Sequence, residues 1–234
     1  MKQTKSRHKI AQMFDQIAVE YDRTNRYLSL GQDFRWRKSL KKYLPQKESL
    51  VVVDLACGTG NQIAAIDQPN IKFYGIDISK EMLKIAKKKL GDNDRIELMI
   101  GSALQIPLDD EVADAVTISF GIRNVSDPAR CLMEILRVLK PGGRILILEF
   151  SIPQSNFVRF FSDFYVHKIV PWMGKKITKK QLPYTYLSDT IEEFYSGESF
   201  VQLMEDNGFI HTSQKTMNFG TVSLYIGEKP QHNR

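Results

Sequence analysis

The residues of this chain best placed to do chemistry are two acids and two glycines around one short loop. Three valines run into Asp54, and a loop of small residues with Gly58 and Gly60 follows at once. Because glycine has no Cβ, the backbone there can turn sharply and lie against a ligand. About twenty residues later a second apolar run ends in Asp77, where doubly wound folds place an acid to accept hydrogen bonds from ribose hydroxyls. The spacing predicts a nucleotide site.

The same residues indicate which nucleotide fits. A dinucleotide fingerprint needs a third glycine three positions after the second, and Ile63 occupies that position. Asp54, just ahead of the loop, would repel a pyrophosphate. S-adenosylmethionine has no phosphate and carries a sulfonium and an ammonium, so nearby acids suit it. We expect this methyl donor, with a dinucleotide or a ligand-free tight turn as alternatives. The expected donor contacts include Asp54, Gly58, Gly60 and Asp77.

Five apolar runs are expected to position this loop as strands of one sheet. Runs without polar alternation are typical of strands buried on both faces. They alternate with segments of helical spacing, which implies an α/β, Rossmann-like fold with a mostly parallel sheet. Two alternating segments around Gly220 predict a terminal antiparallel hairpin. The expected strands are residues 51–54, 71–77, 95–101, 113–120 and 144–150, and the hairpin is 211–227.

Capping residues mark where two of the connecting helices begin. Ser79 is suited to cap a helix that runs to Leu90. Asp127 followed by Pro128 predicts a second helix start, with the acid as cap and the proline at the first helical position. The sequence Pro-Gly-Gly at residues 141–143 is expected to end that helix with a turn before the fifth strand.

The chain is expected to form one domain, residues 1–234, because its length suits a single core. Residues 46–150 hold the repeating strands and helices and form the donor-binding core, and residues 197–234 hold the last helix and the hairpin. Residues 1–45 and 151–196 lie outside that repeat. Since ligands bind at the carboxyl ends of parallel strands, we expect a helical N-terminal cover and a substrate-covering insertion at that edge.

The insertion carries a stripe of aromatic side chains. Its first five members follow the spacing i, i+3, i+4, i+7, i+8 of one helix face. Such a stripe can be core, or it can line a channel for an apolar ligand or face a membrane. Arg159, Asp163 and Lys168 exclude a membrane-spanning helix. The stripe comprises Phe157, Phe160, Phe161, Phe164, Tyr165, Ile169 and Trp172.

Charge and cysteine content limit the partners and the cellular compartment expected for the chain. The net charge is +6, with lysine clusters within residues 84–89 and 175–180, which fit a solvated face, an anionic membrane or a nucleic acid. Cys57 and Cys131 form no CxxC pair, which argues against a metal site and for a reducing compartment. No apolar stretch reaches the ~20 residues of a transmembrane helix, and the basic N-terminus lacks the apolar region of a secretory signal.

Several longer segments resemble one family, the ubiquinone/menaquinone-biosynthesis C-methyltransferases, which includes the demethylmenaquinone methyltransferases. The resemblance runs from about residue 10 to residue 229, nearly the whole chain. The glycine loop and the PGG motif are shared by many methyltransferases, whereas SFGIRNVSD and YDRTN are more specific to the quinone enzymes. The segments are FDQIAVEYDRTNRYLSLGQDFRWR, SFGIRNVSDP, PGGRILILEFS, LPYTYLSDTIEEF and NFGTVSLYIGEKP.

The resemblance implies a class I methyltransferase fold with seven strands and S-adenosylmethionine as donor, without a metal. It implies that the acceptor is a ring carbon of a prenylated hydroquinone, either demethylmenaquinol or its benzoquinol counterpart. Departures from the family pattern at Cys57 and Asn61 bear only on the strength of the donor contact, whereas those at Tyr195 and Tyr225 leave the choice between ring types open. The sequence does not give the tail length. The donor contacts that carry over from the family are Thr59, Asp77, Ser102, Ala103 and Ser119.

Transfer to an aromatic carbon requires an ionised ring hydroxyl, and a phenol has a pKa near 10. Arg123, beyond the fourth strand, is a permanent cation suited to the developing charge, and Asn124 could orient a ring oxygen. Tyr21 and Asn25 in the N-terminal segment are the next candidates for the pocket. Arginine is too basic to accept the proton, so we expect a nearby water to do so. The alternative for Arg123 is a salt bridge to Asp127.

Other functions remain open at this stage. A methyltransferase acting on RNA or on another small molecule is one alternative, although SFGIRN stands where amino-methylating enzymes usually carry an Asn-Pro-Pro-aromatic motif. A non-catalytic donor-binding protein is another. We expect a prenylated quinol as partner, no nucleic acid, and contact with an anionic membrane surface. The expected location is the cytoplasm, at the inner face of the cell membrane, and a homodimer is left open.

Overall fold

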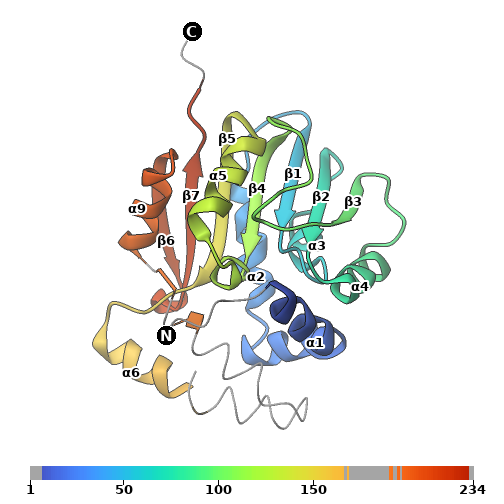
Figure 1. Ribbon diagram of the computed structural model, residues 1–234. Coiled ribbons are helices and arrows are strands. Elements are labelled where there is room, and N and C mark those ends of the chain that lie inside the picture. Colours follow the sequence, from blue (N-terminus) through green and yellow to red (C-terminus); the bar gives the residue numbers. More distant parts are fainter. Residues whose placement is uncertain (1–6, 166–167, 169–189, 192–193, 196, 232–234) are drawn as a thin grey trace.

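A computed structural model describes residues 7–165, 168, 190–191, 194–195 and 197–231. Its seven strands form one sheet in the order β3-β2-β1-β4-β5-β7-β6 (Figure 1). The first five strands pair in parallel, and β7 runs antiparallel to both β5 and β6. The predicted sheet and its terminal hairpin are therefore confirmed. The strands are β1 Leu50–Leu55, β2 Ile71–Asp77, β3 Ile96–Ile100, β4 Ala113–Ser119, β5 Leu139–Phe150, β6 Ile210–Met217 and β7 Val222–Glu228.

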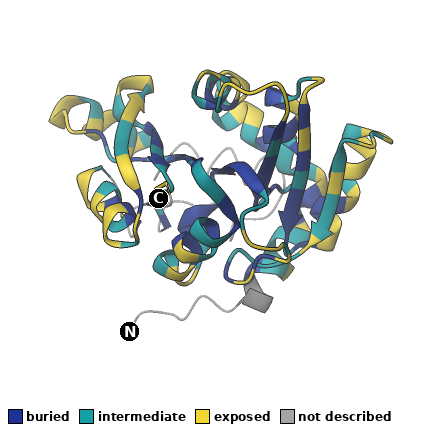
Figure 2. Cartoon of the chain, turned by 90° about the horizontal axis from the view of Figure 1, so that it is seen from above, coloured by how far each residue is buried: buried dark blue, intermediate teal, exposed yellow. Residues whose placement is uncertain are grey.

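Helices cover both faces of this sheet, and the core has two halves. Alternate residues of each central strand face opposite sides, so Val53 packs with α5 and α9 while Val52 packs with α2, α3 and α4. Figure 2 shows the central strands as the most buried part of the molecule. The helices are α1 Arg7–Leu28, α2 Asp33–Ser39, η1 Leu40–Tyr43, α3 Asn61–Ile66, α4 Lys80–Leu90, η2 Ile122–Asn124, α5 Pro128–Val138, α6 Asn156–Phe164, α9 Glu198–Asp206 and η4 Asn218–Gly220.

Both predicted helix caps are present. The Ser79 hydroxyl accepts a hydrogen bond from the amide of Met82 at 3.1 Å, and an Asp127 carboxylate oxygen accepts one from the amide of Arg130 at 3.0 Å. The predicted boundary at Pro-Gly-Gly was wrong, because α5 ends at Val138 and β5 already begins at Leu139. The register between β4 and β5 shifts across residues 139–144, so the three residues form an irregularity inside the strand.

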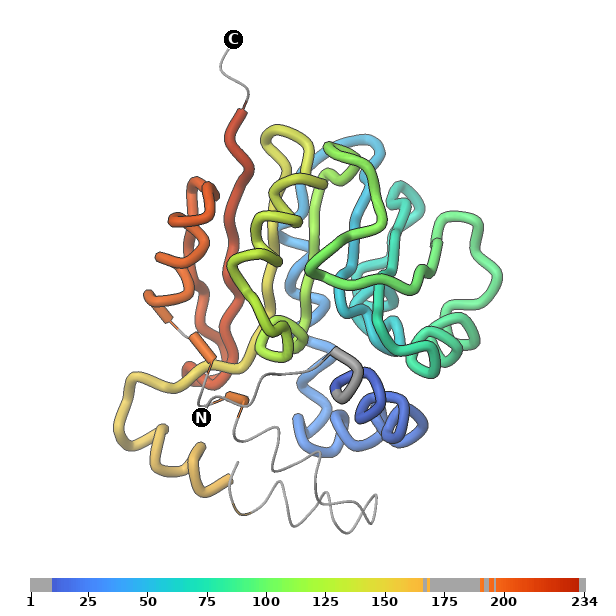
Figure 3. Tube along the Cα trace, viewed as in Figure 1, coloured from blue at the N-terminus to red at the C-terminus, as the bar shows by residue number. Residues whose placement is uncertain are grey.

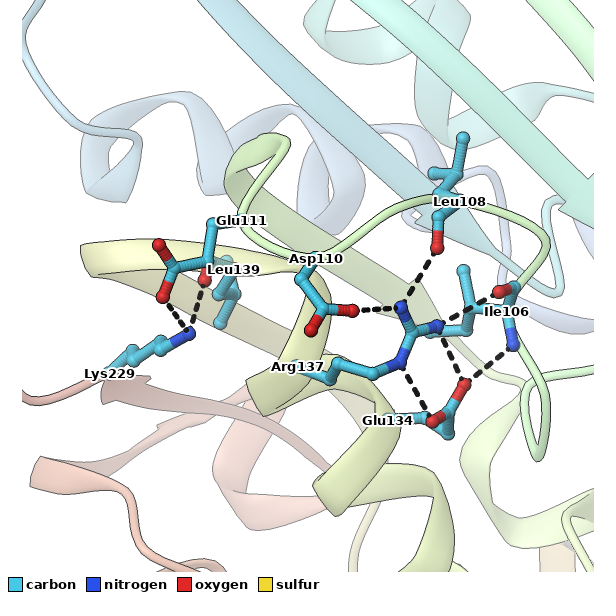
Figure 4. Close-up of polar contacts among 8 residues, drawn as sticks. All are labelled: Ile106, Leu108, Asp110, Glu111, Glu134, Arg137, Leu139 and Lys229. Carbon is cyan, nitrogen blue, oxygen red and sulfur yellow. Dashed lines mark hydrogen bonds and ion pairs between the residues drawn. The ribbon is translucent and has the colours of Figure 1, made fainter.

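One arginine ties the loop after β3 to α5 (Figure 4). The guanidinium of Arg137 donates to the backbone carbonyls of Ile106 and Leu108 at 3.0 and 2.9 Å. It also donates to the carboxylates of Asp110 and Glu134, at 2.7 and 2.9 Å. Glu134 in turn accepts the amide of Ile106 at 2.8 Å. This network fixes the loop that leads from β3 past residues 102 and 103 to β4.

Helices α1 and α6 lie beyond the carboxyl ends of the parallel strands, although they are far apart in the sequence (Figures 1 and 3). Helix α1 packs on α4 through Ile17, Ala18 and Met82. Helix α6 buries none of its residues, and its phenylalanines Phe157, Phe160, Phe161 and Phe164 are 74, 70, 55 and 54% exposed. The interpretation of the stripe as core is therefore wrong for these four. Ile169, Trp172 and the lysines of residues 175–180 lie outside the described residues.

Within the ranges that the structure describes, no helix combines the length and the apolar character needed to cross a bilayer.

Candidate active site

Two adjoining cavities lie at the carboxyl edge of the sheet. The smaller has a volume of about 100 Å³ and the larger about 440 Å³. Four residues line both: Phe14 and Tyr21 from α1, and Phe120 and Asn124 from the segment after β4. A ligand in one cavity would therefore meet a ligand in the other at these four side chains.

The smaller cavity brings together five of the predicted donor contacts from the ends of four strands. Gly58 follows β1, Asp77 ends β2, Ser102 and Ala103 follow β3, and Ser119 ends β4. A side chain at Gly58 would meet only open space, so its backbone is accessible to a ligand. The sequence did not indicate the apolar residues that complete this wall, which include Ile10, Ile78 and Met82.

Asp77 is fixed by the backbone around it. One carboxylate oxygen accepts the amide of Gly58 and the other the amide of Ser79, each at 2.8 Å. Burial raises the pKa of Asp77, and these backbone hydrogen bonds oppose that rise. Each carboxylate oxygen can accept more than one hydrogen bond, so the group keeps acceptor capacity toward the cavity.

Asp54 lines neither cavity and lies behind the glycine loop. It pairs in register with Thr117 of β4, whose hydroxyl donates to one carboxylate oxygen at 2.6 Å. The other oxygen is buried and has no hydrogen-bond partner in the described structure. Burial raises the pKa of Asp54 to about 7, although Thr117 and the charge of Arg37 both act to lower it. The structure thus places Asp54 as a buried acid behind the glycine loop, off the walls of both cavities.

Thr59 and Gly60 also lie off the cavity walls. The Thr59 hydroxyl donates to the carboxylate of Asp22 in α1 at 2.6 Å. The same carboxylate accepts from Asn61 at 2.8 Å and from the ammonium of Lys89. Gly60 has a φ of +78°, and a Cβ there would lie 2.8 Å from Leu90. These contacts hold α1 against the glycine loop, so in this structure Thr59 faces α1.

The larger cavity contains all four residues predicted for the acceptor pocket. Its walls come from α1, α2, the segment after β4, the end of β5, α6 and the η4 turn. They are largely apolar, with Phe14, Trp36, Phe120, Phe150 and Phe161 among them. Such a cavity suits a flat apolar ring with few polar groups. The four predicted residues are Tyr21, Asn25, Arg123 and Asn124.

Arg123 pairs with a buried acid that the sequence analysis missed. One of its Nη atoms lies 2.5 Å from a carboxylate oxygen of Glu149, and both side chains are buried. The same nitrogen donates to the carbonyl of Phe120 at 2.8 Å. The alternative of a salt bridge to Asp127 was wrong: within the described residues the arginine pairs with Glu149, and Asp127 caps α5. Glu149 sits near the end of an apolar strand, as Asp54 and Asp77 do, so the same signal could have found it.

Comparison with known proteins agrees with this geometry. The sequence profile of the ubiE/COQ5 methyltransferase family matches residues 1–229. A demethylmenaquinone methyltransferase of Clavibacter sepedonicus is 37% identical over 221 residues, covering 94% of this chain and 90% of that protein. The ubiquinone/menaquinone biosynthesis C-methyltransferase UbiE of Geobacter sulfurreducens is 40% identical over 232 residues, covering 97% of this chain and 90% of that protein.

Solved structures share the fold at lower identity. A SAM-dependent methyltransferase of Thermotoga maritima superposes with a TM-score of 0.65 at 21% identity, covering 94% of this chain and 99% of that one. The [4+2]-cyclase SpnF superposes with a TM-score of 0.66 at 16% identity, covering 95% of both chains. Because one of these proteins is named as a cyclase, such likeness establishes the fold alone.

Proposed function

The chain belongs to the ubiE/COQ5 methyltransferase family, and from that premise we propose that it methylates a ring carbon of a prenylated hydroquinone. The donor is S-adenosylmethionine, and the product belongs to menaquinone or ubiquinone biosynthesis. The relatives named demethylmenaquinone methyltransferase and UbiE cover almost the whole chain. The observation that carries the proposal at this site is the pair of cavities that share Phe14, Tyr21, Phe120 and Asn124. Such an arrangement suits a donor and an acceptor that must meet in line.

The smaller cavity is proposed as the donor site, where S-adenosylmethionine supplies an electrophilic methyl group. Asp77 would accept hydrogen bonds from the ribose, since its backbone partners already fix its carboxylate. Ser102, Ala103 and Ser119 would complete the contacts, and the open backbone at Gly58 admits close approach. Asp54 would act from behind the loop, because a buried acid with an unpartnered oxygen favours a cation nearby. Contact of the donor with Thr59 and Gly60, and the absence of a metal, stay predictions.

The larger cavity is proposed as the acceptor site, where the protein favours the ionised ring. Arg123 would face the ring oxygen beside the reacting carbon, and Glu149 would hold its guanidinium in place. The buried Oδ1 of Asn124 has no hydrogen-bond partner in the described residues. Before the ring ionises, it would accept a hydrogen bond from the hydroxyl beside the reacting carbon and so orient it. The hydroxyl proton passes to water. The bond from sulfur to the methyl group breaks as the bond from methyl to ring carbon forms. The proton on that carbon then passes to water, and its electron pair restores the aromatic ring.

Helix α6 is proposed to bring the prenyl tail from a membrane to this cavity. One side of the helix lines the cavity through Val158, Phe161 and Tyr165. Phe157 and Phe160 do not line the cavity; their rings pack edge-on against Phe161 and are 74 and 70% exposed, so they are available to contact lipid. We propose peripheral contact with an anionic membrane at its cytoplasmic face, and no role for nucleic acid. The chain would then act as one domain, with residues 1–45 and 151–196 as covers of the core 46–150 and of the C-terminal segment 197–234.

The role of α6 is tested by the double variant Phe157→Ser/Phe160→Ser. We expect the KM for a long-tailed quinol to rise several-fold while the KM for a tail-less quinol stays unchanged, because the tail alone uses the apolar surface. Met133→Ser, an exposed apolar residue on α5, is the matched control and should leave both values unchanged. An equal rise for both quinols would contradict a role in tail binding.

The function itself is tested by complementation. The chain should restore growth of strains that lack the methylation step of menaquinone or of ubiquinone synthesis, and which strain it restores decides the ring type. Asp77→Ala should weaken this rescue, and Asp67→Ala should not, because Asp67 pairs with Arg95 away from both cavities. Failure in both strains, with folded protein present and donor bound, would point to another acceptor, such as RNA or a different small molecule.

A further inference from the structure

A second buried arginine faces the larger cavity; it ends a segment that carries the family resemblance, but the sequence analysis gave it no role. Arg37 lies in α2, is only 6% exposed and lines the cavity. Its Nε is buried and has no hydrogen-bond partner, and no carboxylate of the described residues lies within ion-pair distance of its guanidinium. A buried guanidinium without a hydrogen-bonded carboxylate is costly, so its presence here calls for a reason.

The surroundings of Arg37 show what kind of group it could meet. Its guanidinium lies 5.1 Å from the centre of the Phe120 ring, and Phe120 packs on Phe150 with ring centres 4.7 Å apart. The guanidinium of Arg123 lies 5.4 Å from the centre of the Phe150 ring. The two arginines therefore flank one aromatic pair on the wall of the same cavity. A flat ring lying against that wall would have a cation available at each of two positions.

Both arginines line the larger cavity and not the smaller one. Asn124, the residue after Arg123, lines both cavities, whereas Trp36, the residue before Arg37, lines only the larger. We therefore keep Arg123 for the oxygen next to the reacting carbon. The ring oxygen on the opposite side of a hydroquinone would lie away from the donor, toward Arg37. Thr24 also lines this cavity, and its buried hydroxyl has no hydrogen-bond partner in the described structure. This hydroxyl is therefore available to hydrogen-bond a ligand.

We propose that Arg37 binds the second oxygen of the hydroquinone ring, the one remote from the methylated carbon, and thereby selects dihydric over monohydric rings. This inference rests on the proposed function. A guanidinium suits a ring oxygen in either ionisation state because it donates hydrogen bonds and carries a permanent charge. Held at both oxygens, the ring would be fixed in position against the aromatic wall. A monohydric ring would leave Arg37 buried without a partner, which a site built for a hydroxyl penalises strongly.

The test compares two acceptors in the wild type and in Arg37→Met. One acceptor is the naphthohydroquinone, and the other is the matched naphthol that keeps only the hydroxyl beside the acceptor carbon. We expect Arg37→Met to lower kcat/KM for the hydroquinone on the order of 100-fold, as for a site that loses a group built to bind a substrate oxygen. The naphthol should be affected less than about threefold, because in the wild type it already lacks that contact. If turnover of the naphthol is too slow, the dissociation constants of both rings give the same ratio.

Matched variants separate this role from a structural one. Arg35→Met, an exposed arginine on the same helix, should leave both acceptors unchanged. Arg37→Lys should recover part of the preference, and donor affinity should stay within about twofold in the Arg37 variants if they remain folded. If Arg37→Met does not fold, Arg37→Lys and Arg37→Gln carry the comparison of the two rings.

The outcomes also separate this inference from the function on which it rests. Equal losses for hydroquinone and naphthol would show that Arg37 only supports the fold, and would overturn the inference. Unchanged rates for both would overturn it as well. A wild-type protein that methylates neither ring would instead contradict the proposed function.

Discussion

Two arginines of this molecule, Arg137 and Arg37, occupy opposite kinds of environment. Arg137 has a side chain that is 30% exposed, yet it donates to two carbonyls and two carboxylates (Figure 4). Arg37 is almost fully buried, and its Nε has no partner. Networks with every donor satisfied hold a structure together, whereas an unsatisfied buried group costs stability. The difference indicates which polar groups serve the fold and which are kept for a ligand.

The unsatisfied groups are not scattered through the described chain. The buried oxygens without partners on Thr24 and Asn124 line the larger cavity, and that of Asp54 lies beneath the glycine loop. The network of Arg137 with Ile106, Leu108, Asp110 and Glu134, which we call the clamp, contains no such group. If this contrast reflects function, replacing an unsatisfied group by a neutral one should stabilise the fold, and breaking the clamp should weaken it.

The largest effect on stability is expected at Asp54. Its pKa is about 7 in the folded protein because it is buried, against about 4 in an unfolded chain. Between these values the folded state holds the proton and the unfolded state does not, so the free energy of unfolding falls as pH rises from 4 to 7. That loss is up to about 4 kcal/mol and stays constant above pH 7. Asp54→Asn should remove it. Urea unfolding of the wild type and of Asp54→Asn at pH 4 and pH 8 measures this loss. If the two proteins differ in free energy of unfolding by the same amount at both pH values, this account is contradicted.

Next in size is the effect of Arg123 on turnover. Removing Arg123 alone would leave Glu149 buried without its partner, which costs about 3–5 kcal/mol of stability, so the informative variant is Arg123→Met/Glu149→Gln. It should fold and bind donor normally but turn over at least about 100-fold more slowly. Arg123→Lys should retain part of the rate because the charge remains. Single-turnover rates with both substrates saturating measure this, and a wild-type rate in the double variant would refute the role.

Asp77→Ala should weaken donor binding by about tenfold or more. Each charge-assisted hydrogen bond from a ribose hydroxyl contributes about 1.5–3 kcal/mol, and part of that is offset by water in the variant. Calorimetry on Asp77→Ala and on the control Asp67→Ala measures the loss. Unchanged affinity in Asp77→Ala would remove this carboxylate from the donor site.

The smallest effect is expected at the clamp. Arg137→Met should lower the free energy of unfolding by about 1–2 kcal/mol, because several carbonyls and carboxylates lose one shared donor. The preference for hydroquinone over naphthol should remain unchanged, in contrast to Arg37→Met. Denaturant unfolding and the acceptor comparison check both parts. A changed preference in Arg137→Met would show that the two regions are not separate in function.

The fold and the five predicted donor contacts that line the smaller cavity could be predicted from the sequence because their signals are local. A buried strand ending in an acid, a glycine loop and a capped helix each leave a short pattern, as Asp77 and Ser79 show. Contacts between distant segments leave none. Thr59 faces Asp22, and Arg123 pairs with Glu149, because α1 and β5 arrive from elsewhere in the chain. Arg37 lies in a short helix whose pattern gives no reason to expect a buried charge.

The most direct test of the central claim is the structure of the product. Purified protein with reduced demethylmenaquinone and S-adenosylmethionine carrying a labelled methyl group should give a single product. Mass spectrometry and NMR should place one methyl group on the ring carbon beside the prenyl-bearing carbon. A methyl group on a ring oxygen, or no product although donor and quinol both bind, would contradict C-methylation by this site.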